Sequence, residues 1–526
     1  MKKPLIIFFA IAGILFLAIL GQMRVHRDAS LLTDLKERFR QRHIASVDHT
    51  KLAPLQRKFS SPQEVTLACI SCHTERHKEV MQSSHWNWER EEYIPGRGIT
   101  YLGKKNALNN YCIGTEGNEQ SCAKCHIGFG MTDAKFAFDN ASYVDCLACH
   151  DNTNKYVKAS EQAGKPDPTL NLTEIAQHVG PPQRTNCGTC HFFGGGGNNV
   201  KHGDLDKAMF DPSKDLDVHM ATDGSDMQCA ACHITKNHKI TGKLYSLSSM
   251  NRNRTTCEQC HTERPHDDNI INEHSMKVSC QACHIPTYAK ANATKLFWDW
   301  STAGKLKNGE PYIEEDSDGN HAYMSIKGSF VWGKNLEPEY VWFNGTAGHY
   351  LLGDTVTPTQ PIQINTLYGS YADPDAKIIP VKIHRAKQIY DPKTKLLIQP
   401  KLFDKEKGKG AYWTDFDWNT ASAAGMKQVG LPYSGTYSFV ATEMYWPVNH
   451  QVSPKEKTVS CSECHTREHG RLQSLRDFYL PGRDYNAGIE WFGRLAIILS
   501  LLGVTIHAML RIAASRKRRA SAGGAA

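Results

Sequence analysis

Two long apolar stretches lie near the ends of this chain, with a mainly polar body between them. Residues 1–23 are a basic start followed by an apolar run, and residues 489–512 form a second apolar stretch. Each is close to the roughly 20 residues that a membrane-spanning helix needs. The mean hydropathy of −0.49 agrees with a water-soluble body. The first segment is either a signal sequence or an anchor, and the lack of a clear cleavage site favours an anchor.

Basic residues predict the orientation of both segments. Lys2 and Lys3 precede the first, and residues 513–526 form a tail with the basic run 516–519 after the second. Positive charge stays on the cytoplasmic side, so the body is expected in the periplasm, on the outer face of a cytoplasmic membrane. Much of the formal charge of +8 lies in these clusters. We therefore expect contact with the bilayer and no binding of nucleic acid.

The body divides by its pattern of apolar residues. Residues 24–290 have short, scattered apolar groups, which predict short helices and long loops. Residues 291–445 are rich in aromatic and turn-forming residues, and residues 446–485 return to the earlier pattern. We interpret 291–445 as a segment packed on the domain formed by 24–290, with a separate carbohydrate-binding or catalytic domain as the alternative. The predicted fold class is mainly α with long loops.

Cysteine spacing changes this picture most. Sixteen of the 17 cysteines fall into eight copies of the pentapeptide Cys-x-x-Cys-His. In chain order, the cysteines and histidines of the motifs are Cys69, Cys72 and His73; Cys122, Cys125 and His126; Cys146, Cys149 and His150; Cys187, Cys190 and His191; Cys229, Cys232 and His233; Cys257, Cys260 and His261; Cys280, Cys283 and His284; Cys461, Cys464 and His465.

This spacing is typical of covalent haem attachment. Two thiols three residues apart add to the vinyl groups of one haem, and the adjacent histidine supplies a proximal nitrogen to the iron. A disulfide framework needs no histidine after each pair, and a structural zinc site needs four ligands. The sequence therefore predicts eight covalently bound haem c groups. Stacked haems would replace much of the conventional apolar core, which makes this a multihaem cytochrome c fold.

Seventeen further histidines are available as distal ligands. Conducting haems usually have six-coordinate iron with a second strong nitrogen donor. The histidines that lie beside motifs are the candidate distal ligands: His49, His85, His219, His238, His266, His274 and His450. Seven ligands for eight haems leave one haem that differs. His507 lies in the second apolar stretch and could bind a b-type haem, but one histidine is thin support for this.

Two features do not fit passive conduction. Cys112 is the only cysteine outside a motif, ten residues before the second one. A run of four glycines leads to Lys201 and His202, and glycine lets a backbone pass close to a flat cofactor. The alternatives are a buried inert thiol and a flexible loop that ends in a solvated lysine.

These residues resemble the octahaem tetrathionate reductase family. The resemblance covers residues 45–485 and rests on the eight motifs, the GGGGNNVKHGDL loop, the NNYCIG cysteine, and the WDWSTAG and FNG segments. It implies a haem arrangement similar to that of the hydroxylamine oxidoreductases, with bis-histidine haems around one catalytic haem. The resemblance further implies that the catalytic haem is the one on Cys122 and Cys125, with Lys201 as its distal ligand beside Cys112.

Three functions follow from this reading. The first is a respiratory oxidoreductase that reduces tetrathionate or a related sulfur or nitrogen oxyanion, with Lys201, Cys112 and His202 at the catalytic haem. The second is a non-catalytic electron conduit, and the third is an enzyme that converts hydroxylamine or nitrite. The expected partners are a small inorganic oxyanion, the bilayer, and a quinol-oxidising membrane protein or a c-type cytochrome.

Overall fold

The computed structural model describes residues 45–94, 96–111, 114–242, 250–358 and 361–523, with four positions between 13 and 19. The predicted segment 1–23 therefore lies almost entirely outside the described residues, as does Cys112. The chain divides into two units, Met1–Val459 and Ser460–Ala526, which are treated separately below.

Short helices carry the haem motifs of the first unit, as the scattered apolar pattern predicts. A single helical turn places residues three apart on one face, so it directs both thiols of a motif to the same side. Ser61 caps the first of these helices, accepting a hydrogen bond from the Glu64 amide, and Pro62 follows it. The helices that hold motif residues are α2 Pro62–Cys72, α5 Glu119–Cys122, α6 Leu147–His150, α8 Arg184–His191, α9 Cys229–Cys232 and α11 Cys280–His284, and the sixth motif begins in the 3-10 turn Cys257–Gln259. The helices without a motif are α3 Arg76–Met81, α4 Ser84–Asn87, α7 Leu172–Gln177 and α10 Asn269–His274.

The segment 291–445 differs from the predicted fold class, because it is built on a nine-stranded sheet. Its strands are β5 Thr294–Asp299, β6 Ile313–Glu315, β7 His321–Met324, β8 Gly328–Gly333, β9 Glu339–Phe343, β11 Ile362–Gln363, β13 Lys377–Asp391, β14 Leu396–Leu397 and β15 Ser438–Pro447. The order is β11-β15-β13-β5-β8-β7-β6, with β9 and β14 also paired to β13. The prediction of a mainly α fold is therefore wrong for this segment. Its aromatic and β-branched residues favour extended chain.

Three smaller strand pairs lie outside this sheet. They are β1 Arg90–Ile94 with β2 Gly98–Leu102, β3 Thr235–Lys236 with β4 Lys239–Ile240, and β10 Ala347–His349 with β12 Asn365–Leu367.

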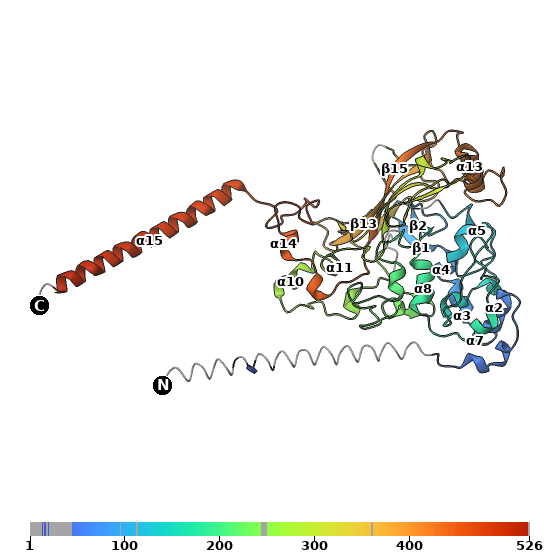
Figure 1. The fold of residues 1–526 in the computed structure, drawn as a ribbon, viewed down its shortest axis with the longest axis horizontal. Helices are drawn as coiled ribbons and strands as arrows, with labels where there is room; N and C mark the ends of the chain where they lie inside the picture. Colours follow the sequence, from blue (N-terminus) through green and yellow to red (C-terminus); the bar gives the residue numbers. More distant parts are fainter. Residues whose placement is uncertain are drawn as a thin grey trace. The chain divides into compact units, whose positions relative to one another are not determined.

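Aromatic side chains form the core between the sheet and two helices, α12 Tyr412–Asp415 and α13 Trp418–Gln428. Trp298 stacks on Trp300 with ring centroids 4.5 Å apart, and Tyr412 stacks on Trp418 at 3.6 Å. Such burial supplies much of the apolar surface that holds this part together. The long strands β13 and β15 run side by side, away from helices α2, α3 and α7 (Figure 1).

One stretch of β13 reaches the region of the haem motifs. Lys382 and His384 are two residues apart on this strand, so their side chains share one face, and both are fully buried. Lys382 pairs with Trp446 of β15 in the antiparallel register. This strand therefore supplies the side chains that meet the loop around Lys201.

The second unit holds the eighth motif and a long apolar helix. Helix α14 Cys461–Cys464 carries the motif, and α15 Ala487–Gly523 follows it. Residues Ala487–Arg518 are long and apolar enough to cross a membrane, with none of the most apolar window buried. The prediction of a helix over 489–512 is confirmed, and its exposed apolar surface is consistent with a membrane anchor.

Candidate functional site

Six of the seven predicted distal histidines face a motif histidine. In each pair the ring centroids lie 6.0–6.4 Å apart. Two metal–imidazole bonds of about 2 Å and the radii of two rings span roughly this distance, so the pairs fit two axial ligands of one iron. The pairs are His49–His73, His85–His191, His150–His238, His219–His261, His233–His450 and His266–His284.

The charge state of these rings also fits metal binding. Burial lowers the pKa of half of the twelve rings, so these are neutral at pH 7, the state in which imidazole binds a metal. They are His85, His150, His191, His219, His233 and His284. Several rings direct Nδ1 at a backbone carbonyl, as His150 does to Gly180 at 2.8 Å and His233 to Thr241 at 2.9 Å. This leaves Nε2 available for iron.

Most of these pairs join residues that are far apart in sequence. His238 follows the fifth motif but faces His150 of the third, and His266 follows the sixth but faces His284 of the seventh. His450 lies shortly before the eighth motif but faces His233 of the fifth. For His274, and for His465 of the eighth motif, ligation stays a prediction.

Thiols of different motifs also meet in pairs. The contacts join Cys69 to Cys146, Cys125 to Cys190, Cys187 to Cys229 and Cys257 to Cys280. The fourth motif therefore contacts the second through one thiol and the fifth through the other. Electrostatic interactions join Cys149 to Cys190 and Cys232 to Cys260. The attachment sites of motifs one to seven thus form one connected series, with the second motif branching from the fourth.

The second motif differs from the others in its histidine. The His126 ring contacts the Trp86 carbonyl through Nε2 at 2.5 Å, and its buried Nδ1 has no hydrogen-bond partner among the described residues. Trp88 and Phe136 pack edge-on against it. Because Nε2 is bonded to the backbone in this conformation, iron binding by His126 stays a prediction and requires the ring to turn within this aromatic pocket.

Lys201 lies beside the second motif. Its Nζ is 4.8 Å from the centre of the Trp446 ring and 5.5 Å from that of Tyr111. Burial, and then the charge of nearby Lys104, lower the pKa of Lys201 to about 7, although Cys125 of the second motif opposes them. A substantial fraction of this amine is therefore neutral at pH 7, and only a neutral amine can bind a metal.

The glycine loop contacts side chains around Lys201. Gly195 has a φ of +83°, and an added Cβ would lie 2.9 Å from Tyr111. Gly203 has a φ of +88°, and a Cβ there would lie 2.8 Å from Tyr288 and 3.0 Å from Lys382. These positions require glycine both for backbone conformation and for space.

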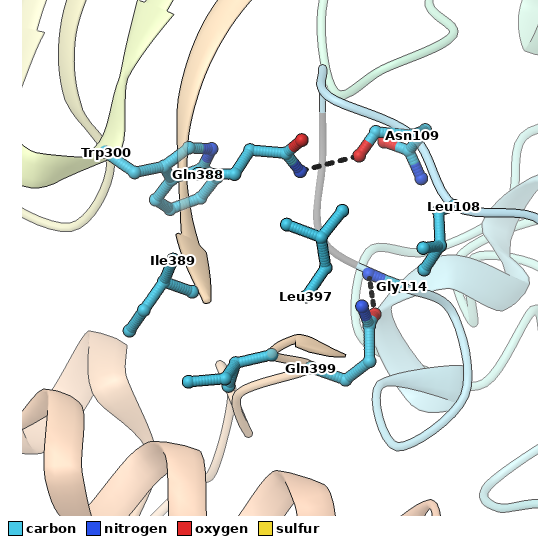
Figure 2. A pocket seen from close by; sticks show the side chains of 9 residues that line it. Leu108, Asn109, Gly114, Trp300, Gln388, Ile389, Leu397 and Gln399 are labelled. Carbon is cyan, nitrogen blue, oxygen red and sulfur yellow. Dashed lines mark hydrogen bonds between the residues drawn. The ribbon is translucent and has the colours of Figure 1, made fainter. Parts of the chain in front are cut away.

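The segment around Cys112 is held on both sides. Asn110 donates to the His384 carbonyl at 2.7 Å, Gln388 donates to the Asn109 carbonyl at 2.7 Å, and Gln399 accepts from the Gly114 amide at 2.7 Å. Figure 2 shows the two glutamines reaching this segment from the sheet side. Tyr111, the residue before Cys112, contacts Lys201. This contact agrees with the prediction that Cys112 lies near Lys201.

His202, the third predicted catalytic residue, contacts the same Trp446 indole. Its ring centroid is 5.2 Å from Trp446, edge to face. Burial, and then the charge of Lys201, hold the pKa of His202 well below its usual range. The ring is therefore neutral, and the structure places it close to Lys201 without showing a catalytic role.

Comparisons with known proteins agree with this arrangement. The family described as "Cytochrome c bacterial" matches residues 295–468. A crystal structure of octahaem cytochrome c from Shewanella oneidensis is 42% identical, with a TM-score of 0.74, over 82% of this chain and 96% of that one. The chain belongs to the octahaem c-type cytochromes. A protein of Archaeoglobus fulgidus described as uncharacterized is 25% identical over 262 residues, which cover 40% of this chain and 86% of that protein.

In this octahaem cytochrome, sequence reasoning missed three buried residues near Lys201: Lys382, His384 and Trp446. The Lys382 ammonium donates to the carbonyls of Val200 at 2.7 Å and Lys201 at 3.1 Å, and to the Thr294 hydroxyl at 2.6 Å. All three come from β13 and β15, where no motif marks them. Alternation along β13 was the only signal that could have grouped Lys382 with His384.

A surface pocket of the octahaem cytochrome lies next to the second motif. Its lining includes Glu119 and Ser121, which closely precede Cys122, and Lys401 and Phe403 from segment 291–445. This segment therefore forms part of the approach to the second attachment site.

Proposed function

We propose that this octahaem cytochrome is a respiratory reductase of tetrathionate or a related sulfur or nitrogen oxyanion. The reaction takes place at a haem attached to Cys122 and Cys125, with Lys201 as a nitrogen ligand. The placement of Lys201 carries this proposal. Its largely desolvated amine lies within electrostatic range of Cys125, at the motif whose histidine contacts a backbone carbonyl through Nε2.

Seven further haems would complete the count of eight and serve conduction. The six histidine pairs hold the haems of the first, third, fourth, fifth, sixth and seventh motifs. The haem of the eighth motif is the seventh of these, with His465 as its proximal ligand, and His274 stays a predicted distal ligand. The fourth motif, in contact with both the second and the fifth, passes electrons to the reaction site.

Positive charge around the second motif favours an anionic substrate. Three lysines lie within electrostatic range of Cys125: Lys104, Lys158 and Lys124. Lys158 is paired with Asp145 at 3.0 Å, whereas Lys104 is exposed and lies over Trp88. Lys104 and a protonated Lys201 would therefore attract an oxyanion.

Cys112 gives tetrathionate a specific route. Its thiolate would attack the central sulfur–sulfur bond, release one thiosulfate and keep the other half as a mixed disulfide. Two electrons then cleave that disulfide, which gives the second thiosulfate and restores the thiolate without consuming a proton. The bound haems supply these electrons. Lys201 positions the anionic ends of the substrate, and Tyr111 and Trp446 exclude water from the site.

The test combines two variants with one control. Reduced protein is mixed anaerobically with tetrathionate, nitrite or hydroxylamine, and reoxidation is followed. Lys201→Ala should give a high-spin signal at one haem and slow reoxidation by at least about 100-fold, whereas exposed Lys207→Ala should change neither. Cys112→Ser should slow the reaction with tetrathionate far more than that with nitrite.

Two results would contradict the proposal. Unchanged spectra and rates in Lys201→Ala would move the reaction site elsewhere and favour a conduit. Equal slowing of all three substrates by Cys112→Ser would exclude the thiol exchange step.

A membrane location completes the proposal. Helix α15 would anchor the haem domain on the periplasmic side, where a quinol-oxidising membrane protein or a c-type cytochrome delivers electrons. Alkaline phosphatase fused after residue 485 should be active, and fused after residue 526 inactive. The reverse pattern would place the haem domain in the cytoplasm.

A further inference from the structure

A buried carboxylate contacts the distal histidine of the fifth motif. The Nδ1 atom of His450 lies 3.1 Å from Oδ2 of Asp204, which is 1% exposed. The same oxygen accepts hydrogen bonds from the backbone amides of Asn449 at 2.7 Å and His450 at 2.9 Å. The ring that faces His450, that of His233, instead directs its Nδ1 at the Thr241 carbonyl.

We propose that Asp204 gives His450 partial imidazolate character and thereby makes the fifth-motif haem the lowest in reduction potential of the six histidine-paired haems. This rests on the bis-histidine ligation proposed above. A carboxylate draws the Nδ1 proton more strongly than a carbonyl does, so Nε2 becomes a stronger donor and stabilises oxidised iron. The effect is large where the dielectric constant is low, as it is around a carboxylate this deeply buried.

Other groups around His450 act in the same direction. Asp217 accepts from the backbone amide of Gln451 at 2.9 Å and is 3% exposed. Asp206 is also buried, and the charge of Asp204 helps to raise its pKa after burial itself. Lys382 is a buried lysine within electrostatic range of Asp204, but its amine donates to the carbonyls of Val200 and Lys201 and to the Thr294 hydroxyl rather than to this carboxylate.

A second paired histidine provides an internal comparison. His238, which faces His150, has its Nδ1 2.8 Å from Oε2 of Glu79. Glu79 also accepts from Arg76 at 2.7 Å, and its side chain is 20% exposed against 2% for Asp204. Because Arg76 and solvent share this charge, Glu79 should affect the third-motif haem less.

The position of the fifth motif gives this tuning a consequence. Its thiols connect the fourth motif, through Cys187, to the sixth, through Cys260. Electrons that pass between the sixth motif and the reaction site therefore cross the fifth-motif haem, which has the lowest reduction potential of the six. Asp204 follows Lys201 by three residues, so one loop positions the reaction site and this haem.

The test is a potentiometric titration of the holoprotein followed by electron paramagnetic resonance. The His233 and His450 rings are 27° from parallel, whereas the rings of the third-motif pair cross at 66°. Near-parallel and crossed imidazoles give different low-spin signals, so the two haems can be followed separately. Asp204→Asn keeps the shape and a hydrogen-bond acceptor but removes the charge. It should move one near-parallel haem to a more positive potential with its low-spin signal intact.

Three variants make the result decisive. Glu79→Gln should give a smaller positive shift, confined to a crossed-ring haem. Asp217→Asn removes a charge from the same loop but no hydrogen bond to His450, so its shift must be smaller than that of Asp204→Asn; an equal shift would overturn the proposal. His450→Met should remove one near-parallel signal. If that signal is lost but Asp204→Asn leaves its potential unchanged, the role of Asp204 fails while the ligation stands.

Discussion

The second and fifth haem motifs both contact the fourth, yet their surroundings carry opposite charge. Lysines surround the second motif, and Lys201 beside it has its pKa lowered to about 7, by burial first. Buried carboxylates surround the distal ligand of the fifth, and Asp204 raises the pKa of His450 although burial opposes it. The same pentapeptide therefore serves two purposes. A basic pocket with an amine suits an anion, and an acidic pocket with an imidazole suits a stable oxidised haem.

The largest expected effect comes from Lys382, which lies between the two regions. Lys382→Met removes three hydrogen bonds, two of them to the backbone of Val200 and Lys201. Loss of these bonds inside the protein should lower the free energy of unfolding by about 2–4 kcal/mol. Denaturant titration measures this. Lys387→Met, on the same strand but half exposed, should cost under about 1 kcal/mol. Equal losses would show that Lys382 does not anchor the loop.

A pH titration should distinguish the two regions next. Protonation of Lys201 competes with iron, so the high-spin fraction of one haem should grow as the pH falls below about 7. The midpoint should lie below that value, because the metal stabilises the neutral amine. Optical spectra between pH 5 and pH 9 measure this. The histidine-paired haems should stay low-spin over the range, and Lys201→Ala should remove the pH dependence.

Neutralising one exposed lysine should weaken the basic pocket moderately. Lys104→Gln should raise KM for an anionic substrate by about 2–5-fold at low ionic strength, and the difference should shrink in salt. Steady-state kinetics at two salt concentrations measure this. Lys239→Gln, exposed in the hairpin that follows the fifth motif, is the matched control. A rise in KM in this control would mean that overall charge, not the second motif, attracts the substrate.

The smallest effect is expected at an exposed carboxylate of the acidic region. Asp215 pairs with Lys457 at 2.7 Å, and both side chains are at least 60% exposed. Asp215→Asn should leave the free energy of unfolding nearly unchanged in denaturant titration and leave every haem potential in place. A shift as large as that expected from Asp204→Asn would mean that burial does not determine which carboxylates tune the fifth haem.

Sequence spacing selected histidines that face motif histidines, but it did not predict which motif each one faces. His49 faces the motif beside it, but His85, twelve residues after the first motif, faces His191 of the fourth. His219 precedes the fifth motif and faces His261 of the sixth. An imidazole needs only to reach the open side of a haem, and loops from elsewhere in the folded chain can do so as well as neighbouring residues.

The sequence by itself determined the chemistry of attachment, because two thiols and a histidine at fixed spacing act within one helical turn. It also determined the apolar helix at 487–523, since length and composition suffice for that prediction. Only the tertiary structure decided that 294–447 forms a sheet, that Lys382 and Trp446 meet Lys201, and that Asp204 meets His450. These contacts join residues up to about 250 positions apart. They depend on how strands and loops pack, and no local pattern records that.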